Sequence, residues 1–215
     1  LKYSRKRTRI GTVKKNSLKN IDLREKLAKK MLTAISKDKL IIFVDETGFN
    51  STIVPTYGYS KKGQRFILDC PPKGKNKSVV AAMTTDKIFC YQIFEGSVKS
   101  QDFGAFIINM INNIDVIRLN LKKVVVFLDN APIHRAKILD PLRELVRFQF
   151  NVAYSPFFNP IEELFSLWKF YFRKDFNSDH NNLLKKIDSA VIRIKAQNIL
   201  SFFCHVLCYY RLCLD

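Results

Sequence analysis

The stretch LIIFVD at residues 40–45 is the part of the sequence that decides the fold. Five consecutive apolar residues followed by an acid are typical of a central β-strand that is buried on both faces. The stretch VVVFLD at residues 124–129 has the same pattern. Two such strands predict an α/β sheet in which Asp45 and Asp129 lie at the carboxyl ends of central strands, where ligands gather in open sheets.

The segments around these two strands predict the remaining elements. Runs of β-forming residues between turn residues indicate further strands at residues 63–69, 78–85, 87–94 and 150–154. Apolar residues at helical spacing predict helices at residues 17–35, 103–114, 135–147, 160–173, 182–196 and 198–212. We therefore expect a mixed sheet of about five strands with helices on both faces.

The composition indicates a folded protein with a polyanionic partner. Hydrophobic residues make up 47% of the 215 residues, which is enough to fill a core and excludes a wholly disordered chain. Lys and Arg outnumber Asp and Glu by 37 to 19, and the resulting charge of +18 points to nucleic acid. Residues 1–38 carry 13 basic and 3 acidic side chains, so we expect a basic arm and linker helix ahead of a domain at residues 39–215.

Other features bear on the compartment. Five Cys residues without a CxxC pair, and no signal peptide, predict an intracellular protein with free thiols. The basic run at residues 5–9 favours the nucleus if the source is eukaryotic, and otherwise the cytoplasm or nucleoid. The apolar segment at residues 199–214 is interrupted by His205 and Arg211, so no membrane span is expected. The first residue is Leu rather than Met, which suggests additional sequence upstream.

Three acids form the candidate site: Asp45, Asp129 and Glu162, the last of which lies at the start of a predicted helix. Two like charges about 4 Å apart repel by roughly 4 kcal/mol at an effective dielectric constant near 20. A cation removes this cost, and all-oxygen ligands favour Mg²⁺ or Mn²⁺. Two such ions can activate the attacking oxygen and stabilise the leaving oxygen in phosphodiester cleavage.

Each acid also has a local explanation. Asp45 and Asp129 can simply begin turns. The sequence Asn159-Pro160-Ile161-Glu162 is a good helix start, with Asn159 as N-cap and Glu162 closing a capping box. The conjunction of two similar strands, each followed by an Asp, with a Glu at a helix start in a very basic chain favours the catalytic interpretation.

Three sequence blocks together resemble a known family. They are IFVDETGF at residues 42–49, VFLDNAPIH at 126–134, and YSPFFNPIE at 154–162 with Trp168-Lys169. In this order they resemble the DDE transposases of the Tc/mariner superfamily, and residues 57–65 are similar to the family's weaker second block. The three acids are 84 and 33 positions apart, and the second spacing is close to the one typical of that family.

The resemblance implies a ribonuclease H-like fold and a metal-dependent DNA transposase that uses two Mg²⁺ or Mn²⁺ ions. By motif position, Asp45 would bind both ions, and Asp129 and Glu162 one each. The implied reactions are cleavage at transposon ends and joining of the 3′-hydroxyl to target DNA. The implied partners are double-stranded DNA, both transposon ends and target, and further copies of the chain in a homodimer or larger synaptic assembly. Such proteins carry an upstream helix-turn-helix region, which nothing before residue 17 can form.

Other residues are secondary candidates. His134 and Asn130 lie in the second block and are predicted to be accessory; His134 could contact DNA, orient a catalytic group or simply begin a helix. Cys204, His205, Cys208 and Cys213 could suggest zinc, but their helical spacing favours core packing. The basic residues expected to contact DNA phosphates are Arg5, Lys6, Arg7, Arg9, Lys14, Lys15, Lys61, Lys62, Lys73, Lys75, Lys169 and Arg173.

Competing functions stay open at this point. A DNA-binding relic or domesticated protein could keep the fold and the charge without turnover. A phosphatase with an Asp nucleophile is disfavoured because Thr47, rather than a second acid, stands two residues after Asp45. Ribonuclease activity on an RNA–DNA hybrid is compatible with the same fold.

Overall fold

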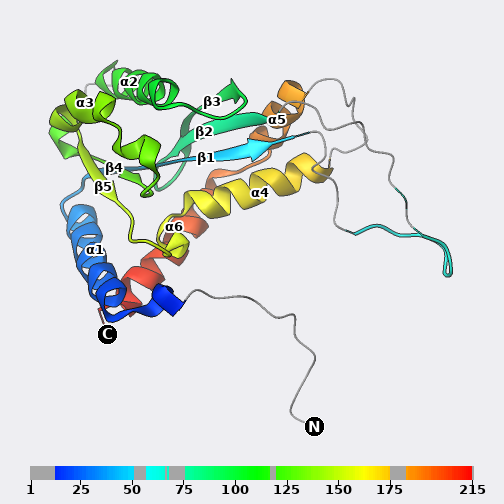
Figure 1. Cartoon of the computed structure of the whole chain (residues 1–215), viewed down its shortest axis with the longest axis horizontal. Helices are drawn as coiled ribbons and strands as arrows, with labels where there is room; N and C mark the ends of the chain where they lie inside the picture. Colours follow the sequence, from blue (N-terminus) through cyan, green and yellow to red (C-terminus); the bar gives the residue numbers. More distant parts are fainter. Residues whose placement is uncertain are drawn as a thin grey trace, which may run out of the picture.

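A five-stranded sheet forms the centre of the molecule (Figure 1). The computed structural model describes residues 13–50, 57–65, 67, 76–116, 120–174 and 183–214. The strand order is β3-β2-β1-β4-β5, with β1 pairing antiparallel to β2 and parallel to β4. The strands are β1 (Leu40–Phe49), β2 (Lys77–Met83), β3 (Ile88–Glu95), β4 (Val124–Leu128) and β5 (Arg147–Phe150). The predicted mixed α/β sheet is thereby confirmed.

Helices cover both faces of this sheet (Figure 1). One face packs against α2 (Ser100–Val116) and the short α3 (Asp140–Leu145). The other face packs against α1 (Leu18–Ser36), α4 (Ile161–Lys174), α5 (Leu183–Ile192) and α6 (Ala196–Leu212). Short 3₁₀ turns connect these elements, at Val13–Asn16 (η1), Leu121–Lys123 (η2), Pro132–Arg135 (η3), Lys137–Leu139 (η4) and Pro156–Phe158 (η5).

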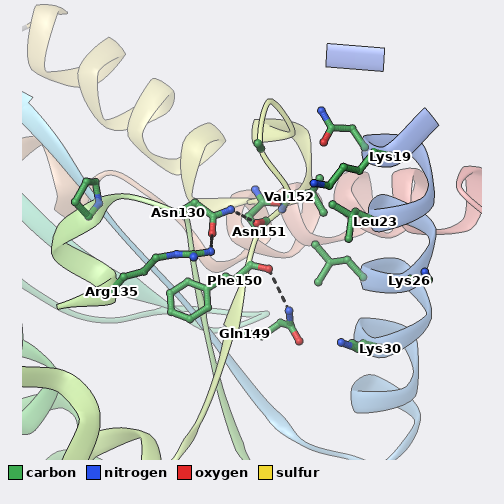
Figure 2. A pocket seen from close by; sticks show the side chains of 14 residues that line it. Lys19, Leu23, Lys26, Lys30, Asn130, Arg135, Gln149, Phe150, Asn151 and Val152 are labelled. Carbon is green, nitrogen blue, oxygen red and sulfur yellow. Dashed lines mark hydrogen bonds between the residues drawn. The ribbon is translucent and has the colours of Figure 1, made fainter. Parts of the chain in front are cut away.

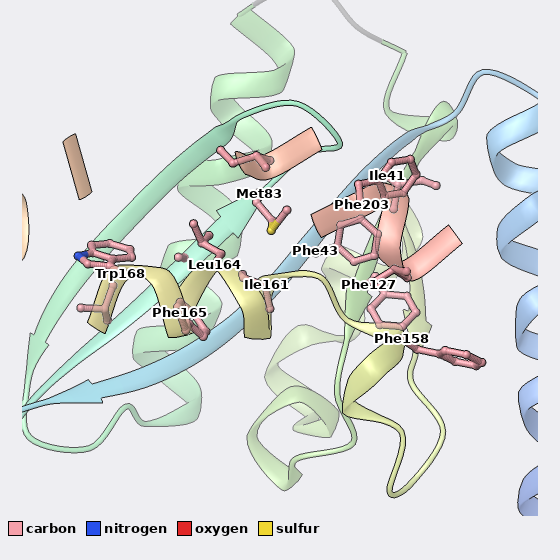
Figure 3. Packing of buried hydrophobic residues seen from close by; sticks show 14 of the residues in the cluster. Ile41, Phe43, Met83, Phe127, Phe158, Ile161, Leu164, Phe165, Trp168 and Phe203 are labelled. Atoms are coloured by element: carbon pink, nitrogen blue, oxygen red, sulfur yellow. The ribbon is translucent and has the colours of Figure 1, made fainter. Parts of the chain in front are cut away.

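The alternation of side chains along β1 divides the core into two layers. Ile41 and Phe43 pack in the layer with α4 and α6, where Figure 3 shows Phe43 near Phe203. Ile42 and Val44 point the other way, toward α2. Successive strand residues face opposite sides of a sheet, so Asp45 belongs to the α4 side and Glu46 to the α2 side.

The structure corrects the predicted position of Asp45 at a strand end. β1 continues to Phe49, because its antiparallel partner β2 pairs with it from Phe43 to Phe49. The parallel partner β4 pairs only with Leu40 to Phe43. Asp45 therefore lies inside β1, just past the point where β4 ends, while Asp129 follows β4 as predicted.

Several other elements differ from their predicted bounds. Residues 57–65 and 67 form no strand, and the rest of the strand predicted at 63–69 lies outside the described residues. The helix predicted at 135–147 is instead η3, η4 and α3, because Pro141 lies in the first turn of α3 and cannot occupy a helix interior. The strand predicted at 150–154 lies earlier, since β5 pairs Phe150 with Leu128, the last residue of β4.

The exposed face of α6 corrects another prediction. Cys204 and Cys208 are exposed, and the buried stripe is formed by Ile199, Phe203, Val206 and Tyr210. The core packing predicted for these two thiols is wrong, because they lie beside the buried stripe rather than in it.

Over the described ranges, no single helix has the length and hydropathy needed to cross a membrane. Only α5 and α6 taken together meet that criterion, and they are bent by 76° relative to each other.

Candidate active site

Asp45 is a buried carboxylate on the α4 side of the sheet, with 8% of its surface exposed. Its Oδ1 accepts the backbone N–H of Glu46 at 2.8 Å, and its Oδ2 accepts the side-chain amide of Asn159 at 3.2 Å. Burial raises the pKa of Asp45 to about 7, and the charges of Asp129, Glu46 and Glu162 add to this effect. Asp45 therefore lacks the positive partner that a buried carboxylate normally has.

Asp129, just after β4, is held by a histidine. Its Oδ1 lies 2.6 Å from His134 Nδ1 and also accepts the backbone N–H of Ala131 at 2.8 Å. Burial raises the pKa of Asp129, but the hydrogen bonds from His134 and Ala131 outweigh it and leave the pKa below its usual value. Asp129 is therefore ionised at neutral pH.

His134 is fully buried between two carboxylates. Its Nε2 lies 2.9 Å from Glu46 Oε2, and its ring packs on Phe103 with the centroids 4.3 Å apart. Burial alone lowers the pKa of His134, but Asp129 and Glu46 together raise it to about 9. Of the roles considered from sequence, this geometry matches the one in which His134 orients a catalytic group. A direct DNA contact is excluded by its burial.

Glu162 is in the first turn of α4 and is exposed to solvent. Burial of part of its surface and the charge of Asp129 raise its pKa, while Lys169 lowers it. The adjacent acid Glu163 points elsewhere, because its Oε1 lies 2.5 Å from His205 Nδ1 on α6. Glu162 is thus the acid of this pair that faces Asp129.

The capping box considered for Glu162 is not formed. Asn159 uses its side-chain N–H on Asp45, and its buried Oδ1 has no hydrogen-bond partner in the described structure. Asn159 therefore serves Asp45 rather than the helix start. The sequence does not distinguish an N-cap role for Asn159 from a hydrogen bond to Asp45, because both roles place an Asn just before Pro160.

A cavity of about 370 Å³ lies at the meeting point of these elements. Asp129, Asn159 and Glu162 line it, together with the loop at residues 151–156, and Asp45 lies beneath Asn159. Tyr154 in this loop has a left-handed backbone with φ of 58°, which is uncommon outside glycine. The loop is held by Asn151, whose side-chain amide donates to the carbonyl of Ser155 at 2.8 Å.

Arg24 is a site residue that sequence reasoning missed. It lies on α1 and is buried, and its Nε donates to Ser155 Oγ at 2.8 Å. Its guanidinium also lies 5.4 Å from the centroid of Phe157. In the sequence it is one of many cations on an amphipathic helix, and only its buried position in the structure distinguishes it.

The three predicted ligands converge without forming a closed metal cage. The charges of Asp129 and Glu162 both raise the pKa of Asp45, and that of Asp129 raises the pKa of Glu162. Over the described ranges, no three His, Cys, Asp or Glu side chains are gathered tightly enough to hold a metal ion. The donor chemistry nevertheless fits a hard divalent cation, because all three side chains supply oxygens and the buried Asp45 lacks a compensating charge.

The predicted DNA-contact residues are only partly brought to this site. Lys169 is half-buried beside Glu162, its Nζ lies 5.8 Å from the centroid of Phe49, and Arg173 follows one turn later on α4. Lys14 and Lys15 are exposed on η1, and Lys61 and Lys62 are exposed in a coil segment. Asn130 donates to the carbonyl of Asn151 and accepts from Arg135. The remaining predicted contacts, Arg5, Lys6, Arg7, Arg9, Lys73 and Lys75, lie outside the described residues.

Comparisons with known proteins agree with this fold. The Mos1 transposase paired-end complex with left transposon end has a TM-score of 0.76 and 15% identity, with 98% of this chain covering 66% of that one. The Mos1 mariner paired end complex with Mn has a TM-score of 0.72 and 15% identity, with 100% and 67% covered. The catalytic domain of Mos1 mariner transposase has a TM-score of 0.65 and 14% identity, with 92% and 93% covered.

The chain thus spans about two thirds of the longer Mos1 chains. Its sheet and helices have the ribonuclease H-like arrangement of the Mos1 catalytic domain. No curated protein sequence matches it significantly. The model of the DDE superfamily endonuclease family matches residues 40–184, a span that contains Asp45, Asp129 and Glu162. The chain therefore belongs to the DDE superfamily endonucleases.

Proposed function

We propose that the chain is the catalytic part of a metal-dependent DNA transposase. The observation that carries this proposal is Asp45, a buried carboxylate whose pKa is raised to about 7 by burial and by the charges of Asp129, Glu46 and Glu162. A structural acid in the core of a sheet is normally neutralised by a cation. Here the neighbours are acidic, which is the arrangement that a divalent ion relieves.

The substrate follows from charge and from the relatives. The chain carries a net charge of +18, and the Mos1 structures contain transposon ends together with Mn or Mg. We therefore propose double-stranded DNA, at transposon ends and at a target, as the substrate. Because the Mos1 complexes are paired-end assemblies, we also propose that the chain acts as a homodimer or larger assembly.

Asp45, Asp129 and Glu162 would be the ligands of the divalent ions. Divalent ions held there would lower the pKa of the attacking water or 3′-hydroxyl and stabilise the charge on the leaving oxygen. His134 would fix Asp129 through one carboxylate oxygen, which leaves its Oδ2 for the cavity. Asn159 would orient Asp45 through its hydrogen bond to Oδ2.

A DNA-nicking assay with Mn²⁺ tests this function. Asp129→Ala and Glu162→Gln are expected to abolish cleavage by the parent chain. Glu163→Gln is the matched control, because Glu163 is the adjacent acid but pairs with His205. Cleavage at the parental rate by Glu162→Gln would remove Glu162 from the mechanism.

The second candidate is a DNA-binding relic or domesticated protein without turnover. The observation that favours it is that Asp45 and Asp129 are engaged by Asn159 and His134 in the structure. Metal-independent DNA binding, without cleavage by the parent chain, would support this alternative. A parent chain that cleaves, with an inactive Asp129→Ala variant, would exclude it.

A further inference from the structure

A groove with a basic lining runs between α1 and the β5 edge of the sheet. Its volume is about 910 Å³. Figure 2 shows Lys19 and Lys30 projecting from α1 on one side, with Arg135 and Gln149 on the other. Lys26 also belongs to the lining, and it pairs with Asp22 at 2.8 Å. Within the described residues that line the groove, no side chain is acidic. None of its four cations was among the contacts predicted from sequence.

The groove adjoins the catalytic cavity, the space of about 370 Å³ that Asp129 and Glu162 line. Asn130, Asn151, Val152 and Ala153 line both spaces, and Asp129 and Glu162 lie on the far side of these shared residues. A DNA strand whose cut phosphate lies beside Asp129 and Glu162 is therefore next to the groove.

The junction between the two spaces is organised around Arg135. Its guanidinium lies 5.0 Å from the centroid of Phe150 and donates to Asn130 Oδ1. Asn130 in turn donates to the carbonyl of Asn151. These contacts fix a permanent positive charge at the mouth of the groove, next to the residue that follows Asp129.

The cations are spaced for a polymer rather than for a small anion. Lys26 and Lys30 lie seven and eleven positions after Lys19 on one side of α1. The separation of Lys19 and Lys30 corresponds to about 16 Å along the helix axis. This length matches roughly five phosphates of one B-form strand. A single phosphate cannot reach all three amines, whereas a continuous backbone can.

The basic lining continues past Lys30. This residue also borders a smaller cavity of about 230 Å³, whose other cationic residues are Lys29, Lys37, Lys39 and Arg147. Cationic residues therefore continue from the groove, through Lys30, to the end of α1 and the start of β5.

We propose that this groove holds the phosphodiester backbone of the DNA strand as it leaves the catalytic cavity. The proposal rests on the proposed function, because it takes the position of the cut phosphate from the three acids. The contacts are to phosphates, so the groove supplies affinity and alignment without reading base sequence.

The test is a charge-matched comparison of DNA binding. The variant Lys19→Gln/Lys26→Gln/Lys30→Gln removes three exposed cations from the groove. The control Lys87→Gln/Lys99→Gln/Lys123→Gln removes three exposed cations that do not line it. Binding of a labelled duplex and of its single strand is measured in EDTA over a range of salt concentrations, so that cleavage does not interfere.

The groove variant is expected to bind DNA at least about tenfold more weakly at moderate salt, with the slope of log K against log salt reduced by about 2 to 3. A duplex occupant loses about 0.9 per lysine and a single strand about 0.7, so the two probes distinguish the form of DNA that is held. The control is expected to keep a slope near the parental value. An equal loss in both variants, or parental binding by the groove variant, would overturn the proposal.

Cleavage kinetics separate the groove from the catalytic site. In Mn²⁺ the groove variant is expected to need more DNA for half-maximal nicking while its maximal rate stays within about twofold. A fall in the maximal rate, with no change in the DNA concentration needed for half-maximal nicking, would contradict the proposal that the groove binds DNA. If the parent chain does not nick DNA at all, the proposed function fails, but the difference in salt slope still decides whether the groove binds DNA.

Discussion

Asp45→Asn is predicted to stabilise the metal-free protein at pH 8. The ionised carboxylate is buried at 8% exposure, and its neighbours include three acids and no positive partner in direct contact. Asparagine has the same shape but carries no charge, so it removes this penalty. A substitution at a proposed catalytic residue should therefore raise the free energy of unfolding.

The magnitude follows from the pKa. A rise in the pKa of Asp45 from 3.8 to about 7 means that ionised Asp45 costs the folded state roughly 4 kcal/mol. Asparagine offers one acceptor oxygen where the carboxylate accepts from both Glu46 and Asn159, and losing one hydrogen bond costs about 1 to 1.5 kcal/mol. The expected net stabilisation at pH 8 is therefore about 2 to 3 kcal/mol.

The pH dependence has a definite sign. A raised carboxyl pKa leaves stability unaffected below the pKa of the unfolded chain, where Asp45 is protonated in both states. The penalty grows as the pH rises from about 4 and is complete above about pH 7. The gap between Asp45→Asn and the parent should therefore open over this range.

Urea denaturation in EDTA at pH 4, 6 and 8 measures this gap. Asp22→Asn is the control, because Asp22 is an exposed acid whose partner is Lys26 on the same helix. Addition of Mn²⁺ should stabilise the parent and have less effect on Asp45→Asn, since a ligand stabilises only the state that binds it. A variant that is no more stable than the parent at pH 8 would refute the view that Asp45 is held ionised against its surroundings.

Three further substitutions test the contacts around the site. His134→Asn is expected to lower the free energy of unfolding by about 3 kcal/mol, because two carboxylates lose their shared buried cation; urea denaturation and the nicking assay should show a loss of stability and of cleavage together. Arg24→Met should cost about 2 kcal/mol by removing the hydrogen bond to Ser155, and hydrogen exchange of the loop at residues 151–156 should increase. Tyr210→Phe should cost about 1 to 2 kcal/mol, because the buried carbonyl of Phe158 loses its donor; Tyr209→Phe, at a half-buried position, is the control in the same denaturation assay.

The sheet could be predicted from sequence where the determinants are local. The apolar runs at residues 40–44 and 124–128 indicated the central strands, and helical periodicity placed α4 within a residue or so of its observed bounds. The end of β1 could not be predicted this way. Its backbone continues past Asp45 because β2 pairs with it, and a pairing across more than thirty residues leaves no mark in the local pattern.

The same distinction between local and long-range determinants applies to the candidate site. Asp45, Asp129 and Glu162 could be selected from their positions in strands and at a helix start. His134 could be proposed to orient a catalytic group, but its second partner Glu46, 88 positions away, could not be predicted. The use of Asn159 for Asp45, 114 positions away, could not be predicted either. Sequence context favoured a helix cap for Asn159, and only the fold decides between that use and a hydrogen bond to Asp45.

These contacts also explain how the fold keeps three acids together. Asp129 has the positive charge of His134, and Glu162 has Lys169 nearby on the same helix, whereas Asp45 has only the neutral amides of Asn159 and Glu46. The unfavourable charge is therefore concentrated at the most buried acid. A cation bound at Asp45 removes the largest single cost in the site, so binding and folding are coupled there. Stabilisation by Mn²⁺ should consequently fall more in Asp45→Asn than in Glu162→Gln. The opposite order would place the ion mainly at Glu162 rather than at Asp45.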